Sequence, residues 1–284
     1  MKPKLTIPDL AEKKRAGDRL VMVAAGEVLT AAWAERAGVD IIGVGDSLGM
    51  TLYGHDNTLA MTLDHMIEHC RAVRRGAPNT MCFVSMPYGS YATQEMAVTN
   101  AVRLMKESGC DAVKLQGGRE KFDIIKAVAD AGVPMMSHVG LLPHYVHKFG
   151  GFKMQGRTAE AALEIIDNAR AIQEAGAIGL EIEAMPYEVS KAVDEAVDIF
   201  TFSIGAGAAG TAQMLNGYDL LGAFDSFKPK FAKRYANMAD IAVQAFADYA
   251  TDVRSGAFPD ADHSYQMKPA EAQRLADILR EEKS

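Results

Sequence analysis

Short apolar runs recur along this chain, and each is followed by a stretch with the periodicity of a helix. The runs are continuously apolar rather than alternating, as expected of parallel strands buried on both faces. Several helical stretches end at Ala-Gly, which is typical of a helix C-terminus just before the next strand. The expected strands are Leu20–Ala24, Ile41–Gly45, Met81–Ser85, Ala112–Gln116, Pro134–Val139, Ile178–Glu183, Ile199–Ile204 and, with the weakest pattern, Leu220–Ala223. The expected helices between them include Val28–Ala37, Gln94–Ser108, Asp123–Ala131 and Ala159–Ala175.

Eight strand–helix units in 284 residues predict a single α/β domain, a (β/α)8 TIM barrel. We expect one domain over 1–284, with the barrel and its loops at about 18–264 and a C-terminal tail or helix at 265–284. A doubly wound sheet is the alternative. It is disfavoured because Ala24-Ala-Gly-Glu27 is not a glycine-rich phosphate turn after the first strand.

The composition excludes several classes of protein. A net charge of −7 argues against a nucleic-acid partner, whose phosphates need a basic surface. No apolar run approaches the ~20 residues of a membrane span, and the N-terminus lacks the apolar core of a signal peptide. Cys70, Cys82 and Cys110 are an odd set without CxxC spacing, so we expect reduced structural thiols and a cytoplasmic location.

Polar side chains stand at the expected strand ends, where a barrel places its catalytic groups. Any one of them could be a structural hydrogen-bonding group, but convergence of Asp46, Lys114, His138 and Glu183 on one mouth predicts an active site. The strand-end residues are Glu27, Asp46, Ser47, Ser85, Lys114, Gln116, His138, Glu181 and Glu183.

Each of these residues has a functional and a structural interpretation. Asp46 is a hard oxygen ligand suited to Mg²⁺, or it caps the following turn. Lys114 binds a substrate anion, or it pairs with a carboxylate such as Asp46. His138 donates to a substrate or to a loop carbonyl. Glu181 and Glu183 are two residues apart and point the same way unless the strand bends between them.

Three later segments have open interpretations. Gly205-Ala-Gly207 suits a close approach of backbone to a ligand. The segment Phe149–Arg157 is either a mobile loop with Lys153 and Arg157 as anion contacts or a solvated loop. Phe227–Tyr235 is basic and aromatic, and a solvated face or an interface is preferred over a flap. We expect a helix over Met238–Ser255, and then a loosely attached tail from Pro259 that ends in a helix-like Pro269–Glu282.

The order of segments resembles the ketopantoate hydroxymethyltransferase family over about residues 18–264. The resemblance depends on many collinear stretches rather than on one motif. They are Val44-Gly-Asp-Ser-Leu-Gly-Met-Thr, Gly54-His-Asp-Asn-Thr, Ala72-Val-Arg-Arg-Gly-Ala-Pro, Val113-Lys114, Gly117-Gly118, His138-Val-Gly-Leu, Phe149-Gly-Gly-Phe-Lys-Met-Gln-Gly-Arg, Glu183-Ala-Met-Pro, Ile204-Gly-Ala-Gly and Pro229-Lys-Phe.

The resemblance implies a TIM barrel of the phosphoenolpyruvate/pyruvate superfamily, assembled as a homo-oligomer with a decamer among the expected sizes. It implies transfer of a hydroxymethyl group from 5,10-methylenetetrahydrofolate to 3-methyl-2-oxobutanoate with Mg²⁺, in pantothenate biosynthesis. Residue by residue, it makes Glu183 the base and Asp46 a metal ligand. It assigns Asp46, Ser47, Ser85, Lys114 and His138 to substrate binding.

Two positions of the expected metal site depart from the family pattern. Ser85 and Gln116 stand where the family places an Asp and a Glu at the metal, so two negative charges are missing. The ion is then expected to bind weakly, through Asp46 and the oxo acid, or Lys114 and His138 act as the electrophile with little metal. A divergent paralogue that makes or breaks a C–C bond on another 2-oxo acid is an alternative. A non-catalytic barrel that binds an oxo acid is another.

Overall fold

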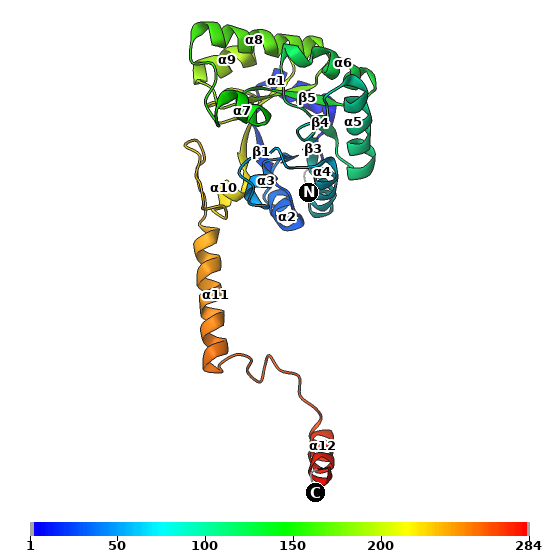
Figure 1. The fold of residues 1–284 in the computed structure, drawn as a ribbon, viewed down its shortest axis with the longest axis vertical. Helices are drawn as coiled ribbons and strands as arrows, with labels where there is room; N and C mark the ends of the chain where they lie inside the picture. The colour runs from blue at the N-terminus through cyan, green and yellow to red at the C-terminus, as the bar shows by residue number, and fades with distance from the viewer. Residues whose placement is uncertain (1–2, 283–284) are drawn as a thin grey trace. The chain divides into compact units, whose positions relative to one another are not determined.

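The computed structural model describes residues 3–282 and contains the predicted barrel (Figure 1). Parallel strands β1 to β8 pair in sequence order, and β8 pairs with β1, so the sheet closes. The strands are β1 (Leu20–Ala24), β2 (Ile41–Val44), β3 (Met81–Ser85), β4 (Ala112–Lys114), β5 (Met135–Gly140), β6 (Gly179–Glu183), β7 (Phe200–Ile204) and β8 (Ala212–Asn216).

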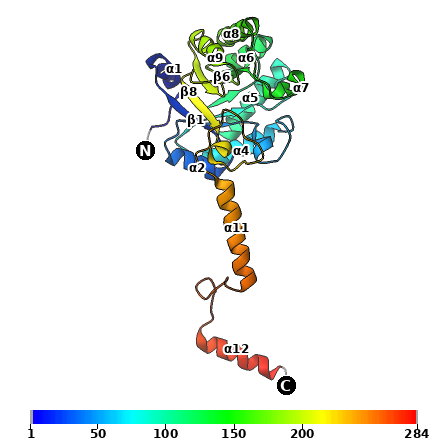
Figure 2. The same ribbon diagram turned by 90° about the vertical axis from the view of Figure 1, so that its left-hand side faces the viewer.

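Helices surround the closed sheet, and the two views agree on this arrangement (Figures 1 and 2). The α-helices are α1 (Ile7–Ala16), α2 (Val28–Arg36), α3 (Leu48–Thr51), α4 (Leu63–Gly76), α5 (Gln94–Ser108), α6 (Phe122–Asp130), α7 (Val146–Phe149), α8 (Ala159–Glu174), α9 (Tyr187–Glu195), α10 (Gly217–Leu221), α11 (Met238–Ser255) and α12 (Pro269–Glu281). Two short 3₁₀ turns, η1 (Arg119–Lys121) and η2 (Pro143–Tyr145), follow β4 and β5.

The eighth strand was predicted in the wrong place. The strand is Ala212–Asn216, whereas Leu220–Ala223 covers the end of α10 and the residues after it. Gln213 is exposed on β8, so this strand lacks the continuous apolar run that marks the others. Leu220-Leu221 has the apolar pair, but Gly222 in the left-handed region ends a helical turn there.

The chain divides into two compact units, residues 1–236 and 237–284. The barrel lies entirely in the first unit, and the second contains α11 and α12, which agree with the expected helices at Met238–Ser255 and Pro269–Glu282. The expectation of one domain over the whole chain stays a prediction. Among the described residues, no helix is both long and apolar enough to cross a membrane.

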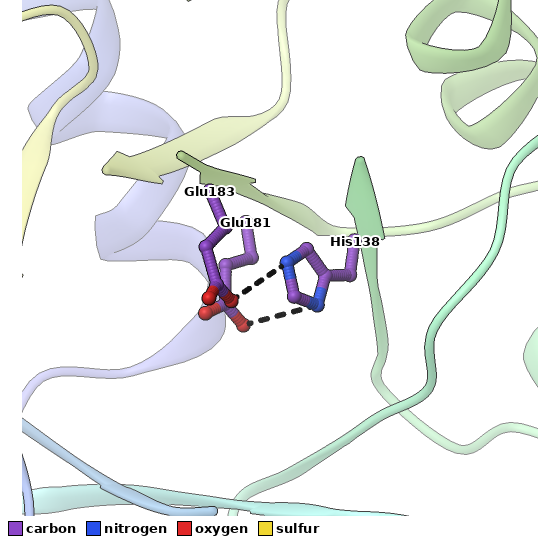
Figure 3. Close-up of side chains that lie close together, drawn as sticks. All are labelled: His138, Glu181 and Glu183. Atoms are coloured by element: carbon purple, nitrogen blue, oxygen red, sulfur yellow. Dashed lines mark ion pairs between the residues drawn. The ribbon is translucent and has the colours of Figure 1, made fainter. Parts of the chain in front are cut away.

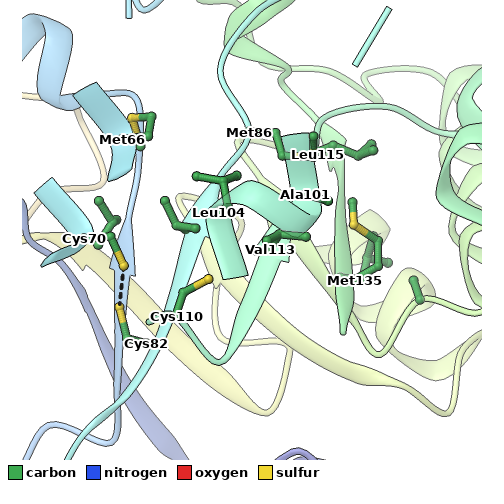
Figure 4. Close-up of a cluster of buried hydrophobic side chains, with 14 of the residues drawn as sticks. Met66, Cys70, Cys82, Met86, Ala101, Leu104, Cys110, Val113, Leu115 and Met135 are labelled. Atoms are coloured by element: carbon green, nitrogen blue, oxygen red, sulfur yellow. Dashed lines mark hydrogen bonds between the residues drawn. The ribbon is translucent and has the colours of Figure 1, made fainter. Parts of the chain in front are cut away.

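Two apolar layers hold the barrel together. One lies between strands and helices, where Ile42, Val84, Val113 and Leu180 contact the helices outside. The three cysteines are unpaired and buried in this layer, with the Cys70 and Cys82 sulfurs 3.9 Å apart (Figure 4). The other layer fills the barrel interior with residues such as Met22, Ile41, Met81, Phe83, Phe200 and Phe202.

Helix α1 belongs to the interior layer, because Leu10 is only 1% exposed and packs with the inner strand residues. Thr6 and Asp9 form a capping box at its start, and Gly17 ends it in the left-handed region. Lys14 ties its last turn to Asp194 of α9 through a 2.6 Å ion pair. The N-terminal end of the barrel interior is therefore apolar and anchored to α1.

Candidate active site

Along strands β3 to β6, the inward-facing residues change from apolar residues in the barrel interior to polar side chains at the carboxyl end. Inner residues two apart run Met81, Phe83, Ser85 on β3 and Met136, His138 on β5. Because side chains alternate between the two faces of a strand, the polar residues continue the inner stripe toward the carboxyl end. The same alternation continues Ala112 into Lys114 and Gln116, and Gly179 into Glu181 and Glu183.

A cavity of about 660 Å³ opens at the carboxyl ends of the strands. It brings together the residues that the sequence placed at strand ends, while Phe83, Ile204 and Met214 form its apolar wall. The strand-end residues that line it are Asp46, Ser47, Ser85, Lys114, Gln116, His138, Glu181 and Glu183. All of them lie in the first compact unit.

Strand β6 carries two carboxylates on the same side. The strand is paired with β5 through its last residue, with His138 opposite Glu181 and Gly140 opposite Glu183, so no bend separates the two glutamates. Both carboxylates point toward the His138 ring (Figure 3). The His138 Nδ1 atom is 3.9 Å from Glu181, and its Nε2 atom is 3.1 Å from Glu183.

The backbone turns sharply after Glu183. Ala184 has a φ of +45°, in the left-handed region. Gly140 on the neighbouring strand has a φ of +95°, and a Cβ there would lie 2.2 Å from the Glu183 carbonyl oxygen. That oxygen accepts a hydrogen bond from the Leu141 amide at 2.9 Å. The close approach of these two backbones fixes where Glu183 enters the cavity.

The pKa values of the two glutamates shift in opposite directions. Burial raises the pKa of Glu183, and its contact with His138 only partly offsets this, so the pKa is above its ordinary value. Burial also raises the pKa of Glu181, but His138 and Lys114 outweigh it, so that pKa is below its ordinary value. Glu183 is therefore the carboxylate better matched to a proton acceptor near neutral pH.

Lys114 pairs with Glu181 rather than with Asp46, the partner suggested from sequence. Both side chains are buried, at 7% and 3% exposure. Burial lowers the pKa of Lys114, but the opposing effect of Glu181, and then of Asp46, is larger. The pKa is therefore above its ordinary value. The result is an ammonium group held at the cavity wall with carboxylates on two sides.

Asp46 has a partner that the sequence did not suggest, His144 of η2. The His144 Nε2 atom hydrogen-bonds to the Asp46 carboxylate, and Nδ1 lies 2.5 Å from the Tyr91 hydroxyl. Burial raises the pKa of Asp46, but His144 and Lys114 outweigh it and leave the pKa below its ordinary value. The His144 amide donates to the Gln116 Oε1 atom at 2.9 Å. The only hint in the sequence was a histidine five residues beyond the expected fifth strand, directly after Pro143.

Some predicted contacts lie elsewhere. Glu27 does not line the cavity, since its carboxylate caps α2 by accepting from the amides of Leu29 and Thr30. Lys153 and Arg157 are exposed and do not line it either, whereas Phe152 and Met154 of the same loop do.

The basic aromatic segment is closer to the site than expected. Phe227, Pro229, Lys230 and Phe231 line the cavity, which supports the flap interpretation, and the preferred solvated and interface interpretations stay predictions. Gly205 approaches this flap. A Cβ at Gly205 would lie 2.6 Å from the Phe231 ring.

His138, Glu181 and Glu183 are the described groups whose spacing suits a cation. Their ligand atoms lie within 4.8 Å of one another, and both His138 ring nitrogens lack a hydrogen-bond partner among the described residues. However, the Lys114 ammonium already contacts Glu181. A cation in this cluster would compete with that lysine.

Relatives at high identity cover almost the whole chain. The sequence pattern of the family described as ketopantoate hydroxymethyltransferase matches residues 4–261. The chain is 48% identical over 276 residues to 3-methyl-2-oxobutanoate hydroxymethyltransferase 1 of Methylibium petroleiphilum, covering 97% of this chain and 94% of the relative. It is 46% identical to 3-methyl-2-oxobutanoate hydroxymethyltransferase of Alkaliphilus metalliredigens, with coverage of 94% and 95%.

Solved structures support the fold. A 2,3-dimethylmalate lyase of the PEP mutase/isocitrate lyase superfamily matches with a TM-score of 0.59 at 15% identity, covering 98% of this chain and 99% of that one. A phosphonopyruvate hydrolase in complex with oxalate and Mg²⁺ matches with a TM-score of 0.61 at 14% identity, covering 98% of both chains. The barrel is therefore of the type found in that superfamily.

Proposed function

The chain belongs to the ketopantoate hydroxymethyltransferase family, and from this membership we propose that it forms ketopantoate from 3-methyl-2-oxobutanoate. The proposed donor of the hydroxymethyl group is 5,10-methylenetetrahydrofolate, and the proposed pathway is pantothenate biosynthesis. One observation carries the proposal. Glu183, Lys114 and His138 share one cavity with Asp46 and Ser47 at the carboxyl end of the barrel.

Glu183 acts as the base in this proposal. It takes the proton from C3 of the oxo acid, and the electron pair moves into the C2–C3 bond so that the 2-oxo oxygen becomes an enolate. C3 of the enolate then attacks the methylene carbon, and a new C–C bond forms. The bond between this carbon and the folate nitrogen breaks, water supplies the oxygen of the hydroxyl group, and tetrahydrofolate leaves. Support comes from the raised pKa of Glu183, caused by burial, and from its position on the cavity wall.

The groups opposite the base stabilise negative charge. Lys114 supplies a buried ammonium that faces the cavity, and it binds the anionic end of the oxo acid. The Ser85 hydroxyl is buried in the cavity wall and has no hydrogen-bond partner among the described residues, so it is free to donate to the substrate. His138 and Ser47 complete the polar surface around the same substrate.

The Mg²⁺ that the family implies would polarise the oxo acid when bound, but the three positions that the resemblance assigns to it do not fit a protein-anchored ion. Of the three positions expected to bind it, only Asp46 has a carboxylate, and His144 hydrogen-bonds to that carboxylate. The Gln116 oxygen accepts the His144 amide. Because Mg²⁺ requires several well-placed oxygen ligands, the proposal routes no step through the ion.

The outer cavity has room for a second substrate. A volume of about 660 Å³ far exceeds a five-carbon oxo acid, and the space is within the range of sites for drug-sized ligands. Phe152, Phe227 and Phe231 offer aromatic faces, and Lys230 offers a positive charge. This lining suits the ring and the acidic tail of a folate.

We also propose a homo-oligomer, up to the decamer expected from the family resemblance. Apolar residues remain exposed on α11, with Phe246 at 73% and Val243 at 68%, and on the barrel, with Leu29 at 58% and Val21 at 53%. Burial of such surfaces by further copies of the chain stabilises an assembly. The three unpaired cysteines support a reducing compartment, and we propose the cytoplasm.

A second candidate is a paralogue that makes or breaks a C–C bond on another 2-oxo acid. It is favoured by the neutral Ser85 and Gln116 and by the Lys114–Glu181 pair, which together change how charge is distributed around the substrate. Glu183 keeps the role of base in this candidate.

Proton exchange tests these proposals. The purified protein is mixed with 3-methyl-2-oxobutanoate in D₂O, and loss of the C3 proton signal is followed by NMR. We expect exchange in the wild type and a loss of about 10³-fold or more in Glu183→Gln, whose side chain cannot accept the proton. Glu188→Gln, on the exposed face of α9, is the matched control and should exchange normally.

The pattern of failure separates the candidates. Exchange of another 2-oxo acid but not of this one supports the paralogue. Exchange of no 2-oxo acid supports a barrel that only binds oxo acids. Exchange that persists in Glu183→Gln contradicts the role of the base. Addition of methylenetetrahydrofolate then tests the donor, since ketopantoate must accumulate.

A further inference from the structure

His144 is a buried histidine that lies behind the cavity wall and hydrogen-bonds to Asp46, which lines the cavity. It is 4% exposed, and its amide and both ring nitrogens have partners, which lie on different segments of the barrel top. Its ring also stacks on Tyr91 at 5.8 Å and meets the edge of Tyr88 at 5.7 Å. His144 itself does not line the cavity, so it reaches the substrate side only through Asp46.

Each ring nitrogen of His144 has its own partner. Burial, and then the charge of Asp46, raise the pKa of Tyr91 far above its ordinary value, so the phenol keeps its proton. The Tyr91 hydroxyl is the partner of Nδ1, and because an ionised carboxylate can only accept, the hydrogen in the contact with Asp46 is on Nε2. Nε2–H then donates to Asp46. The chain from Tyr91 through His144 presents a hydrogen atom to the carboxylate at the place where a cation would bind.

The oxygen atoms around Asp46 either already accept a hydrogen bond or carry no charge. Asp46 accepts from His144, the Gln116 Oε1 atom accepts the His144 amide, and Ser85 offers only a hydroxyl. A divalent ion at Asp46 would compete with the imidazole for this carboxylate and would gain no second carboxylate at these three positions. The His144 imidazole thus gives the Asp46 carboxylate a hydrogen-bond donor as its partner, in the role that a metal ion would otherwise have.

We propose that His144, positioned by Tyr91 and Gln116, takes the place of the divalent cation beside Asp46, so that this site binds and activates its oxo acid without Mg²⁺. His144 is a positioning residue, because it holds Asp46 and does not touch the substrate. Lys114 is the buried cation that lines the cavity. The activity readout of this inference rests on the proposed function, whereas its metal-binding readout does not.

A cation at His138, Glu181 and Glu183 is the competing possibility. The three groups are close enough to ligate one ion. However, that ion would displace the Lys114 ammonium from Glu181 and occupy Glu183, the proposed base. The observations therefore favour His144 in place of the cation beside Asp46. Binding of a cation at the other three residues is one outcome that the test can detect.

The metal-binding arm uses Mn²⁺ as a spectroscopic probe for divalent ions. Full-length wild-type protein is titrated with Mn²⁺, and free ion is followed by electron paramagnetic resonance. We expect no binding at micromolar Mn²⁺ in the wild type. His144→Gln frees Asp46 and should tighten Mn²⁺ binding by about tenfold or more, as changes next to a metal ligand commonly shift affinity by this much. His144→Gln combined with Ser85→Asp and Gln116→Glu should tighten it further.

The activity arm measures C3 proton exchange in EDTA and in millimolar Mg²⁺. Wild-type exchange should be the same within about twofold in both solutions, whereas His144→Gln should be slower in EDTA and recover by about tenfold with Mg²⁺. Tyr91→Phe removes only the hydroxyl that orients the imidazole and should shift in the same direction by less. Tyr88→Phe keeps the ring beside His144, and its exposed hydroxyl makes it the matched control, with wild-type behaviour expected.

Several results would overturn the inference. Wild-type exchange that stops in EDTA and returns with Mg²⁺ would do so, as would tight Mn²⁺ binding to the wild type. If Glu181→Gln removes such binding, the ion lies in the competing cluster. Should no form exchange any oxo acid, the proposed function fails, and the Mn²⁺ titration still decides whether His144 excludes the ion.

Discussion

The two ends of the barrel interior are built from the same strands but do different things. At the N-terminal end, Phe200, Phe202 and Leu10 are almost fully buried in an apolar cluster. At the carboxyl end, Lys114 and Glu181 are just as buried, but they are charged and paired. Burial stabilises the first set by about 1.5–3 kcal/mol per large side chain, whereas it destabilises each charge of the second set. The apolar end thus stabilises the barrel that the polar end requires.

The buried pair at the polar end gives the largest expected effect. Lys114→Met leaves the Glu181 carboxylate buried opposite an apolar side chain, so we expect a loss of about 3–5 kcal/mol in the free energy of unfolding. Urea denaturation measures it. The double variant Lys114→Met/Glu181→Leu removes both charges and should recover most of the loss. A loss below about 1 kcal/mol in the single variant would show that Glu181 finds another partner.

The apolar end should show a loss of stability without a loss of chemistry. Leu10→Ala removes a buried side chain between α1 and the inner strand residues, and we expect a cost of about 2–4 kcal/mol. Proton exchange per folded molecule should stay at the wild-type level. The exposed Glu12→Ala on the same helix is the control, with little change expected. If Leu10→Ala also slows proton exchange per folded molecule, the two ends are coupled and the contrast between them is wrong.

The anchor of α1 gives a smaller, pH-dependent effect. Burial raises the pKa of Asp194, but its bonds to Lys14 and Thr201 outweigh this, so the pKa is below its ordinary value. The folded state therefore favours the ionised form, and the stabilisation is present above the unfolded pKa of about 3.9 and is lost as pH falls through the folded value. We expect Asp194→Asn to cost about 1 kcal/mol at neutral pH.

Thermal unfolding of the wild type and Asp194→Asn across acidic pH measures this effect. The two curves should converge as the pH falls below 4. Curves that stay parallel over the whole range would mean that the carboxylate charge contributes nothing to the anchor.

The smallest effect concerns the bend at the polar end. Ala184 has a φ of +45°, which a residue with a Cβ adopts at a cost of about 1 kcal/mol. Ala184→Gly relieves that cost but makes the unfolded chain more flexible, so we expect a net change of at most about 0.5–1 kcal/mol in favour of folding. Calorimetry measures it, and a destabilised variant would contradict the strain. Exchange should slow if the bend also holds Glu183 in place.

Much of the fold could be predicted from the sequence because most strands are uninterrupted apolar runs. The strand at Ala212–Asn216 could not, since Gln213 and Asn216 break its apolar pattern, and Gln213 lies on an exposed part of the barrel's outer face. Helix α1 was not predicted either. Its only fully buried residue is Leu10, so it lacks the apolar stripe of a packed helix.

The candidate site was predicted less completely than the fold. Position at strand ends was enough to select Asp46, Lys114, His138 and Glu183, because parallel strands bring their carboxyl ends together. Pairing inside the site depends on side-chain reach across the barrel. Lys114 meets Glu181 from 67 positions away in sequence, and His144 meets Asp46 from 98 positions away. No local pattern contains that information.

The register between β5 and β6 limits how this site can change. His138 lies directly opposite Glu181, and inner and outer side chains alternate along both strands. An insertion of one residue before Glu181 would turn both carboxylates into the helix layer and place Ile182 over the substrate. Natural variation at this position must therefore proceed by exchange of side chains at constant strand length, whereas the loops beyond can lengthen freely. A search for divergent members with new substrates should compare inward-facing pairs, strand by strand.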